Sequence, residues 1–324
     1  MFLHNQKIDI VYTWVNNKDP IWIKKRNFYS LESIETEANN NARFEDNEEL
    51  KYSLRSLEKN ASWINNIFII TDNQVPNWLN TKHPKIKIIN HSNIIPKEYL
   101  PIFNSISLDH SIINIPELSE FFLYACDDMF FAKKITSSFF YAWDGLPIFR
   151  FNGFFDKNSI GLHSRICFYT EECFKNTYKK YNKLNMYAHH NIDGYRKSDL
   201  IKCQQVFKEE INNSIKSRFR TASNIERTIY ALYCIFNKRG HYKGVYRTDI
   251  YLPFFKNKTF NFIKKYYRPD TVVIPITNSN YDDFFTDKIK LFCINDEETA
   301  TSSDRLRAKI FLEKYFPEKS QFEK

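Results

Sequence analysis

The hydrophobic residues of this chain fall into short apolar runs, each of which ends in polar residues. The run FFLYAC at 121–126 shows no polar alternation, which is typical of a strand buried on both faces of a parallel sheet. Similar runs at 7–15, 66–71 and 85–90 predict three further strands. Because a helical pattern separates the first two of these, the sequence predicts an α/β fold with a Rossmann-like core and a mostly parallel sheet.

Helical spacing of Leu50, Leu54 and Leu57 predicts a helix at 43–61, and Asp46 and Glu49 have the spacing of a capping box at its start. A final helix is expected to be capped by Asp304 and to run to Tyr315. The remaining segments are predicted as a turn at 16–20, a mobile loop at 31–42, a helix at 102–116 and strands at 147–151, 248–255 and 271–277.

The chain shows no internal repeat and no low-complexity linker, so residues 1–324 are expected to form one compact unit. Within this unit, residues 7–160 are predicted to form the Rossmann-like half and residues 161–245 a helical lobe. Residues 246–324 are predicted to add strands and a helix that complete the core.

Composition narrows the classes of function. The chain has 6 Gly and contains neither GxGxxG nor GxxxxGK[ST], which disfavours nicotinamide and P-loop enzymes. Its net charge of +9 suits an anionic partner, but charge alone does not distinguish a nucleotide sugar, an anionic polymer, a membrane surface and a nucleic acid. The 6 Cys form no CxxC motif, and the chain lacks a signal peptide and a long apolar run, so we expect a reduced, cytoplasmic protein, soluble or peripheral to the membrane.

The sequence places several candidate functional groups at expected strand or helix ends. Asp127 and Asp128 follow the apolar run at 121–126, where paired carboxylates suit Mg²⁺, although a turn cap and a solvated Asp would look the same. Arg43 would lie at a helix N-terminus, which favours a phosphate, with ordinary capping as the alternative. His189 and His190 lack zinc-site spacing, so a zinc site is rejected.

Five sets of segments together resemble the conserved regions of the Stealth family. In chain order they are IDIVYTWVN, RFEDNEELKYSLRSLEKNASWINNIFIITDNQVPNWL, DHS…LSEFFLYACDD, AHHNID…FRTASNIERTIYALY and CINDEE…AKIFLEKYFPEKSQFE. The resemblance extends over most of the chain, from residue 7 to residue 323. This family includes bacterial capsule polymerases and the catalytic subunit of the animal enzyme that attaches N-acetylglucosamine-1-phosphate to lysosomal glycoproteins.

The resemblance implies a phosphotransferase of bacterial capsule or surface polysaccharide synthesis. Such an enzyme moves a hexose-1-phosphate, commonly an N-acetylhexosamine-1-phosphate, from a UDP-sugar to a hydroxyl of an oligo- or polysaccharide, with release of UMP and dependence on Mg²⁺ or Mn²⁺. It implies no nucleic-acid partner, and it is compatible with a peripheral position at the inner membrane or in a capsule-assembly complex. The alternatives are a conventional metal-dependent glycosyltransferase that releases UDP, and a non-catalytic module that binds anionic glycans.

The same resemblance implies roles for particular residues. Asp127 and Asp128 match the acidic pair of the family and are expected to hold the metal ion. His190, with His189 as the rival, is the candidate base, and Arg220 is expected to stabilise the transition state. Asp109, where the family often has Glu, would orient the histidine or share the metal. The residues expected around the nucleotide sugar are Tyr12, Thr13, Trp14, Asn16, Arg43, Asn47 and Asn73.

Overall fold

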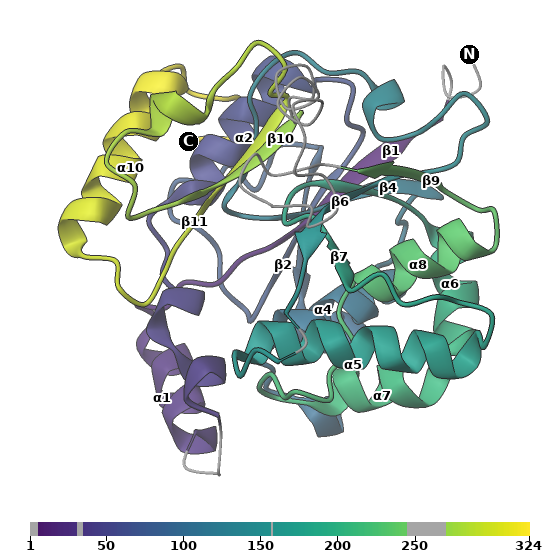
Figure 1. The fold of residues 1–324 in the computed structure, drawn as a ribbon. Helices are drawn as coiled ribbons and strands as arrows, with labels where there is room; N and C mark the ends of the chain where they lie inside the picture. The colour runs from purple at the N-terminus through teal and green to yellow at the C-terminus, as the bar shows by residue number, and fades with distance from the viewer. Residues whose placement is uncertain (1–5, 31–34, 157, 245–269) are drawn as a thin grey trace.

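The computed structural model of the chain, which describes residues 6–30, 35–156, 158–244 and 270–324, is built around a five-stranded sheet (Figure 1). All neighbouring strands of this sheet pair in parallel except the last pair, which is antiparallel. The predicted α/β class with a mostly parallel sheet is therefore confirmed. In spatial order the strands are β3 (Ile86–Asn90), β2 (Ile67–Thr71), β1 (Ile8–Thr13), β4 (Phe121–Cys126) and β8 (Asp193–Arg196).

Two smaller sheets have three strands each. Strand β5 follows β4 immediately after Asp127 and Asp128, so the acidic pair joins the central sheet to the second sheet. The second sheet contains β10 (Thr271–Pro275), β11 (Leu291–Asn295) and β5 (Met129–Phe131). The third contains β7 (Met186–Ala188), β6 (Ile148–Phe154) and β9 (His241–Gly244).

Helices lie on both sides of the central sheet. In Figure 1, α2 and α10 lie on one side of the molecule and α5, α7 and α8 on the other. Their bounds are α1 (Pro20–Tyr29), α2 (Glu49–Asn60), α3 (His91–Ile94), α4 (Ser105–Ser111), α5 (Leu162–Thr177), α6 (Lys197–Val206), α7 (Lys208–Lys216), α8 (Thr228–Phe236) and α10 (Ser302–Tyr315).

Helices on both sides explain why the central strands carry uninterrupted apolar runs. Ile10 of β1 packs in the cluster that contains Leu54 of α2, whereas the next residue, Val11, belongs to the cluster that contains Ile229 of α8. Successive side chains of a strand point to opposite faces, so both faces of β1 are buried. The carboxylate of Asp9 is also buried, and it accepts hydrogen bonds from the backbone N–H groups of Asn66 and Ser119, at 3.0 and 2.8 Å.

Two predicted helix starts are wrong in detail. Helix α2 begins at Glu49 rather than at residue 43, and the residue before it, Glu48, has a φ of 68° and provides no side-chain cap. The predicted capping box is absent because the Glu49 carboxylate turns back to accept a hydrogen bond from the Asn47 backbone N–H at 2.7 Å. Helix α10 is capped by Thr301, and Asp304 is the reciprocal partner three residues later rather than the cap itself.

Other predictions also change. Residues 16–20 do not simply turn, because the Asp19 side chain accepts hydrogen bonds from the backbone of Ile21 and Trp22 and so caps α1. Of the loop predicted at 31–42, the described part contains two short 3₁₀ helices, Thr36–Asn39 and Asn41–Arg43. The strand predicted at 248–255 lies outside the described residues. All six cysteines are free, as expected, and no helix among the described residues is long and apolar enough to cross a membrane.

Candidate active site

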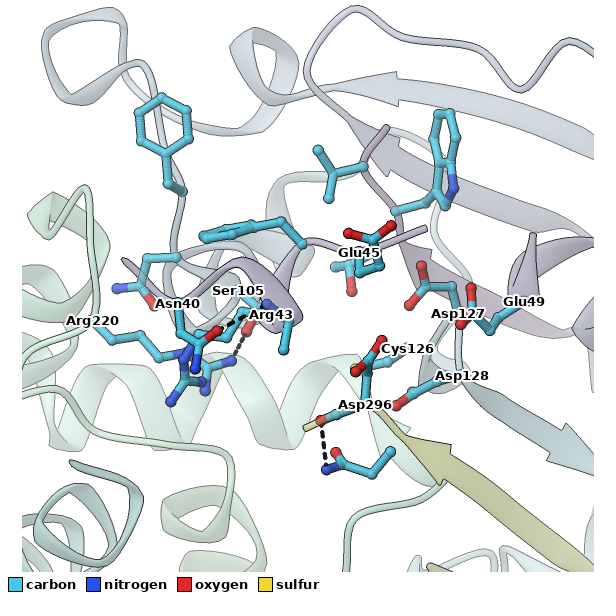
Figure 2. A pocket seen from close by; sticks show the side chains of 18 of the residues that line it. Asn40, Arg43, Glu45, Glu49, Ser105, Cys126, Asp127, Asp128, Arg220 and Asp296 are labelled. Atoms are coloured by element: carbon cyan, nitrogen blue, oxygen red, sulfur yellow. Dashed lines mark hydrogen bonds between the residues drawn. The ribbon is translucent and has the colours of Figure 1, made fainter. Parts of the chain in front are cut away.

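A cavity of about 530 Å³ lies at the carboxyl ends of three strands, two of the central sheet and one of the second sheet (Figure 2). Residues directly after β1, β4 and β11 line it, together with residues from the loop before α2 and from the start of α4. Ligands of open α/β sheets bind at this edge, because loops that leave neighbouring strands form a crevice there. The fold therefore brings parts of the chain that are nearly 300 residues apart, Thr13 and Asp296, to one site.

One end of the cavity is acidic. Asp127 and Asp128 follow β4, Glu49 begins α2, and Asp296 follows β11. Burial and the charges of Asp128 and Glu49 raise the pKa of Asp127 well above its ordinary value. Burial, together with the charge of Asp46, also raises the pKa of Glu49, to about 8. Carboxylates crowded in this way repel one another, and a cation between them would relieve the repulsion.

The other end of the cavity is basic. Figure 2 shows Arg43 and Arg220 side by side, opposite the acidic groups. Arg220 comes from the segment before α8, and its Nη2 donates a hydrogen bond to Ser105 Oγ at 2.6 Å. Burial and the nearby charge of Arg220 lower the pKa of Arg43 to about 10, which still leaves the Arg43 guanidinium charged at neutral pH. Two such groups form a strong binding site for phosphate oxygens.

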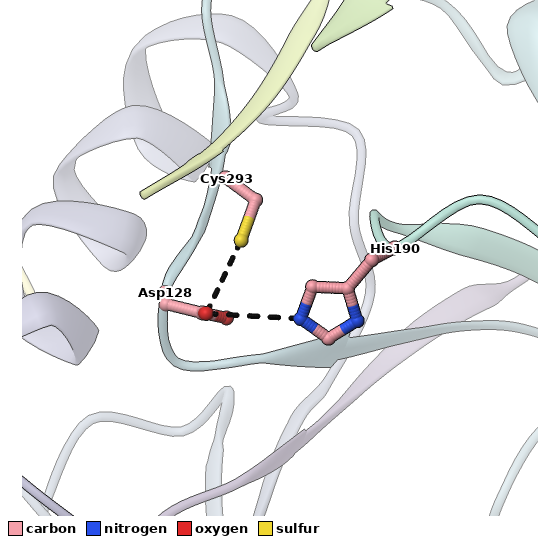
Figure 3. Close-up of side chains that lie close together, drawn as sticks. All are labelled: Asp128, His190 and Cys293. Carbon is pink, nitrogen blue, oxygen red and sulfur yellow. Dashed lines mark hydrogen bonds and ion pairs between the residues drawn. The ribbon is translucent and has the colours of Figure 1, made fainter. Parts of the chain in front are cut away.

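His190 lies beside Asp128 (Figure 3). Its Nε2 is 3.8 Å from Asp128 Oδ2, and the imidazole is 42% exposed, so it can reach a ligand in the cavity. His189 is only 1% exposed, and its Nδ1 lies 3.1 Å from Thr271 Oγ1. Of the two histidines, the structure therefore brings His190 to the site, and His189 serves as an internal anchor.

Cys293 of β11 is the third member of this group. The ligand atoms of Asp128, His190 and Cys293 all lie within 4.8 Å of one another. The Cys293 thiol is fully buried and donates a hydrogen bond to Asp128 Oδ2 at 3.1 Å, and burial together with the charge of Asp128 raises its pKa well above the ordinary value. In this structure the thiol therefore acts as a hydrogen-bond donor that positions the Asp128 carboxylate.

Seven of the residues predicted from the sequence line the cavity. They are Thr13, Trp14, Arg43, Asp127, Asp128, His190 and Arg220. Arg43 reaches it from a 3₁₀ helix rather than from the predicted helix N-terminus, so a phosphate there would be bound by the side chain and not by the end of α2.

Four residues expected around the nucleotide sugar do not line the cavity. Tyr12 is fully buried, with its hydroxyl 3.0 Å from Ser53 Oγ, because odd and even positions of β1 face opposite sides. Asn16 Oδ1 accepts a hydrogen bond from the Lys18 backbone N–H at 2.9 Å, and Asn47 Nδ2 donates to the carboxylate of Glu49, which itself lines the cavity, at 2.7 Å. Asn73 occupies a left-handed turn, with a φ of 58°, after β2.

Asp109 is also outside the cavity, although Ser105 and Leu108 of the same helix line it. Its carboxylate accepts a hydrogen bond from the Tyr124 hydroxyl and lines a separate cavity of about 20 Å³. Burial raises the pKa of Asp109 to about 6. Among the described residues, no hydrogen bond or ion pair joins Asp109 to His190 or to the acidic pair. The charges of Arg227, Arg220 and His190 nevertheless act on Asp109 and partly offset the effect of burial on its pKa, so its expected roles, orienting the histidine or sharing the metal, stay a prediction.

Groups missed in the sequence include Glu49 and Asp296, which line the cavity, and Cys293, whose thiol donates to Asp128. A signal existed for Asp296, because LFCI followed by ND repeats the pattern of an apolar strand that ends in a carboxylate, as in FFLYAC followed by DD. Glu49 was interpreted as a capping residue, and nothing in the local pattern distinguishes a capping carboxylate from one that faces a cavity.

The site and the sheet define the protein as an α/β protein whose cavity at the strand ends pairs a cluster of carboxylates with two arginines. Comparison with known families matches residues 6–33 to Stealth protein conserved region 1 and residues 43–149 to Stealth protein conserved region 2. The chain belongs to the Stealth family.

Several relatives carry informative names. The chain is 35% identical to the capsular polysaccharide phosphotransferase fcs1 of Haemophilus influenzae, over 71% of this chain and 65% of that protein. It is 34% identical to a capsular polysaccharide phosphotransferase of Neisseria meningitidis serogroup B, over 71% of this chain and 64% of the relative. The chain thus matches slightly less than two thirds of these two proteins. Capsular polysaccharide phosphotransferase WcwK of Streptococcus pneumoniae is 29% identical over 98% of both chains.

Proposed function

We propose that this protein is a phosphotransferase that moves a sugar-1-phosphate, such as N-acetylhexosamine-1-phosphate, from a UDP-sugar to a hydroxyl of a glycan. The products are a phosphodiester and UMP, and the process served is the synthesis of a capsule or other surface polysaccharide in a bacterium. The names of the relatives support the phosphotransfer. The observation that carries the proposal is the polarity of the cavity, with carboxylates at one end and Arg43 and Arg220 at the other.

A divalent cation fits the acidic end. Asp128 Oδ1 is buried and has no hydrogen-bond partner, and carboxylate oxygens are the ligands that Mg²⁺ and Mn²⁺ prefer. We assign Asp127 and Asp128 as the residues that would hold the cation. When bound, such an ion neutralises a diphosphate and so makes the phosphorus a better electrophile.

The remaining groups suit transfer at the phosphorus that bears the sugar. The acceptor oxygen forms a bond to this phosphorus, the bond to the bridging oxygen breaks, and UMP leaves with the electron pair. His190 accepts the proton of the acceptor hydroxyl at Nε2, the ring nitrogen that faces Asp128. Arg220, fixed by Ser105, stabilises the charge that develops on the phosphoryl oxygens, and Arg43 binds the phosphate of the nucleotide.

The test is incubation with a panel of UDP-sugars, Mg²⁺ and short glycan acceptors. We expect release of UMP and a phosphodiester signal in ³¹P NMR of the glycan product. Release of UDP would reject the proposal in favour of a conventional glycosyltransferase. Glycan binding that is unchanged by Asp128→Ala or His190→Ala, without any nucleotide product, would instead indicate a binding module.

A further inference from the structure

The loop that carries His190 is fixed from behind by groups that do not line the cavity. His189 and Asn191 on either side of it are fully buried, whereas His190 itself is 42% exposed. The backbone N–H of His189 donates to the carbonyl of Arg150 in β6 at 2.9 Å. The His189 imidazole lies between Thr271 Oγ1 at 3.1 Å and Asp193 Oδ1 at 3.3 Å.

Arg227, the residue before α8, bonds to the backbone on both sides of His190. Its Nη2 donates to the carbonyl of His189, and its Nη1 donates to the carbonyl of Asn191 at 3.2 Å. Nη1 is also 3.7 Å from Asp193 Oδ2, and the Arg227 side chain is 11% exposed. A planar guanidinium can hold two carbonyl groups in a defined orientation, whereas the single ammonium of a lysine cannot reproduce this fork.

The partner of Arg227 connects this loop to the strand that carries the acidic pair. Asp193 begins β8 and lies opposite Tyr124 of β4 in the antiparallel register. Asp128 follows Tyr124 by four residues on the same chain segment. The pair of strands β4 and β8 therefore sets both positions. The end of β4 leads directly to Asp128, and β8 carries Asp193, which pairs with the Arg227 that holds the loop of His190.

We propose that Arg227 is a positioning residue that holds the His190 imidazole beside Asp128 in the orientation needed for proton transfer. This inference rests on the proposed function, because it assigns a purpose to the placement of the base. It also explains the adjacent histidines: His189 anchors the loop in the interior, and Arg227 fixes the backbone so that His190 projects into the cavity.

The experiment compares Arg227→Lys and Arg227→Gln with matched substitutions of another buried arginine. Arg55 is 6% exposed, donates to the carbonyl of Phe316 at 2.8 Å and to Glu323 at 2.9 Å, and does not line the cavity. Arg55→Lys and Arg55→Gln therefore report the effect of removing a buried guanidinium on stability alone. All variants are assayed below their unfolding temperature, with folded protein verified by circular dichroism.

We expect Arg227→Lys to lower kcat about tenfold and Arg227→Gln about 100-fold, with donor KM changed much less, since a displacement of the reacting group by about 1 Å costs about 10²-fold in rate. The Arg55 variants should lose thermal stability at unchanged kcat. If Arg227→Gln does not fold, Arg227→Lys carries the test. A kcat for Arg227→Lys within twofold of the wild type would overturn the proposal.

A second readout does not depend on turnover. Ring signals of His190 in ¹³C-edited NMR spectra, assigned with His190→Gln, should shift or broaden in Arg227→Lys and stay in place in Arg55→Lys. Unchanged His190 signals in Arg227→Lys would overturn the positioning role. Absence of UMP release from the wild type with every donor would instead reject the proposed function, while the NMR comparison still tests how Arg227 holds the loop.

Discussion

His110 offers a quantitative test of the packing between α4 and the helical lobe. The imidazole is fully enclosed, its Nε2 lies 2.7 Å from the carbonyl oxygen of Ile225, and burial lowers its pKa from 6.5 to about 4. The folded protein therefore keeps His110 neutral at a pH where the unfolded chain protonates it. Because the unfolded state then binds more protons, the contribution of this group to stability is lost as the pH falls below 6.5 and levels off below about 4.

The magnitude follows from the pKa difference. At pH 5 the His110 imidazole is mostly protonated in the unfolded chain but mostly neutral in the folded protein. Folding with a neutral His110 therefore costs about 2 kcal/mol more at pH 5 than at pH 7, at about 1.4 kcal/mol per pH unit. His110→Gln keeps an N–H donor but does not titrate. We therefore expect the difference in unfolding free energy between wild type and His110→Gln to shift by about 2 kcal/mol in favour of the variant between pH 7 and pH 5.

The assay is urea unfolding of both proteins at the two pH values, with equal m-values as the check for two-state behaviour. Neighbouring groups that titrate, such as Asp109 with its raised pKa, are present in both proteins and cancel in the difference to first order. A difference in unfolding free energy that is the same at pH 7 and pH 5 would refute the reasoning, because it would mean that His110 titrates alike in the folded and unfolded states.

Three further predictions concern the cavity and its wall. Asp128→Asn should lower the rate of UMP release by 10²-fold or more, as expected for loss of an electrostatic group at the reacting centre, with little change in thermal stability; an unaltered rate would remove Asp128 from the site. Removal of divalent cations with EDTA should stop UMP release and added Mg²⁺ should restore it, whereas full activity in EDTA would contradict the assignment of the acidic pair. Trp22→Ala should lower the unfolding free energy by about 3–5 kcal/mol in urea titrations, because the buried ring packs against Phe44 and Phe103 with centroids 5.2 and 5.5 Å away; a loss below 1 kcal/mol would contradict this packing.

Local sequence patterns were sufficient for the four parallel strands of the central sheet but not for β8, which lies in the segment predicted to be a helical lobe. The segment around 121–126 and the β1 segment were recognisable because strands covered on both faces have no polar alternation, and their ends were marked by polar residues. The same logic located Asp127 and Asp128 at the carboxyl end of a strand. Local patterns did not predict α1, and they placed the start of α2 too early. The residues near these two boundaries suit turns and helix caps equally well, and the tertiary contacts of Trp22 and Glu49 decide which of the two forms.

The sequence by itself determined the α/β class, the acidic pair and, through the order of its motifs, the family. The tertiary structure alone decided which polar groups share one cavity. Two adjacent histidines are chemically identical, and only packing distinguishes His189, held in the interior by Asp193 and Thr271, from His190 at the cavity. Likewise, Glu49 and Asp296 join the acidic end because α2 begins and β11 ends at the edge where β4 ends, an arrangement that no local pattern contains.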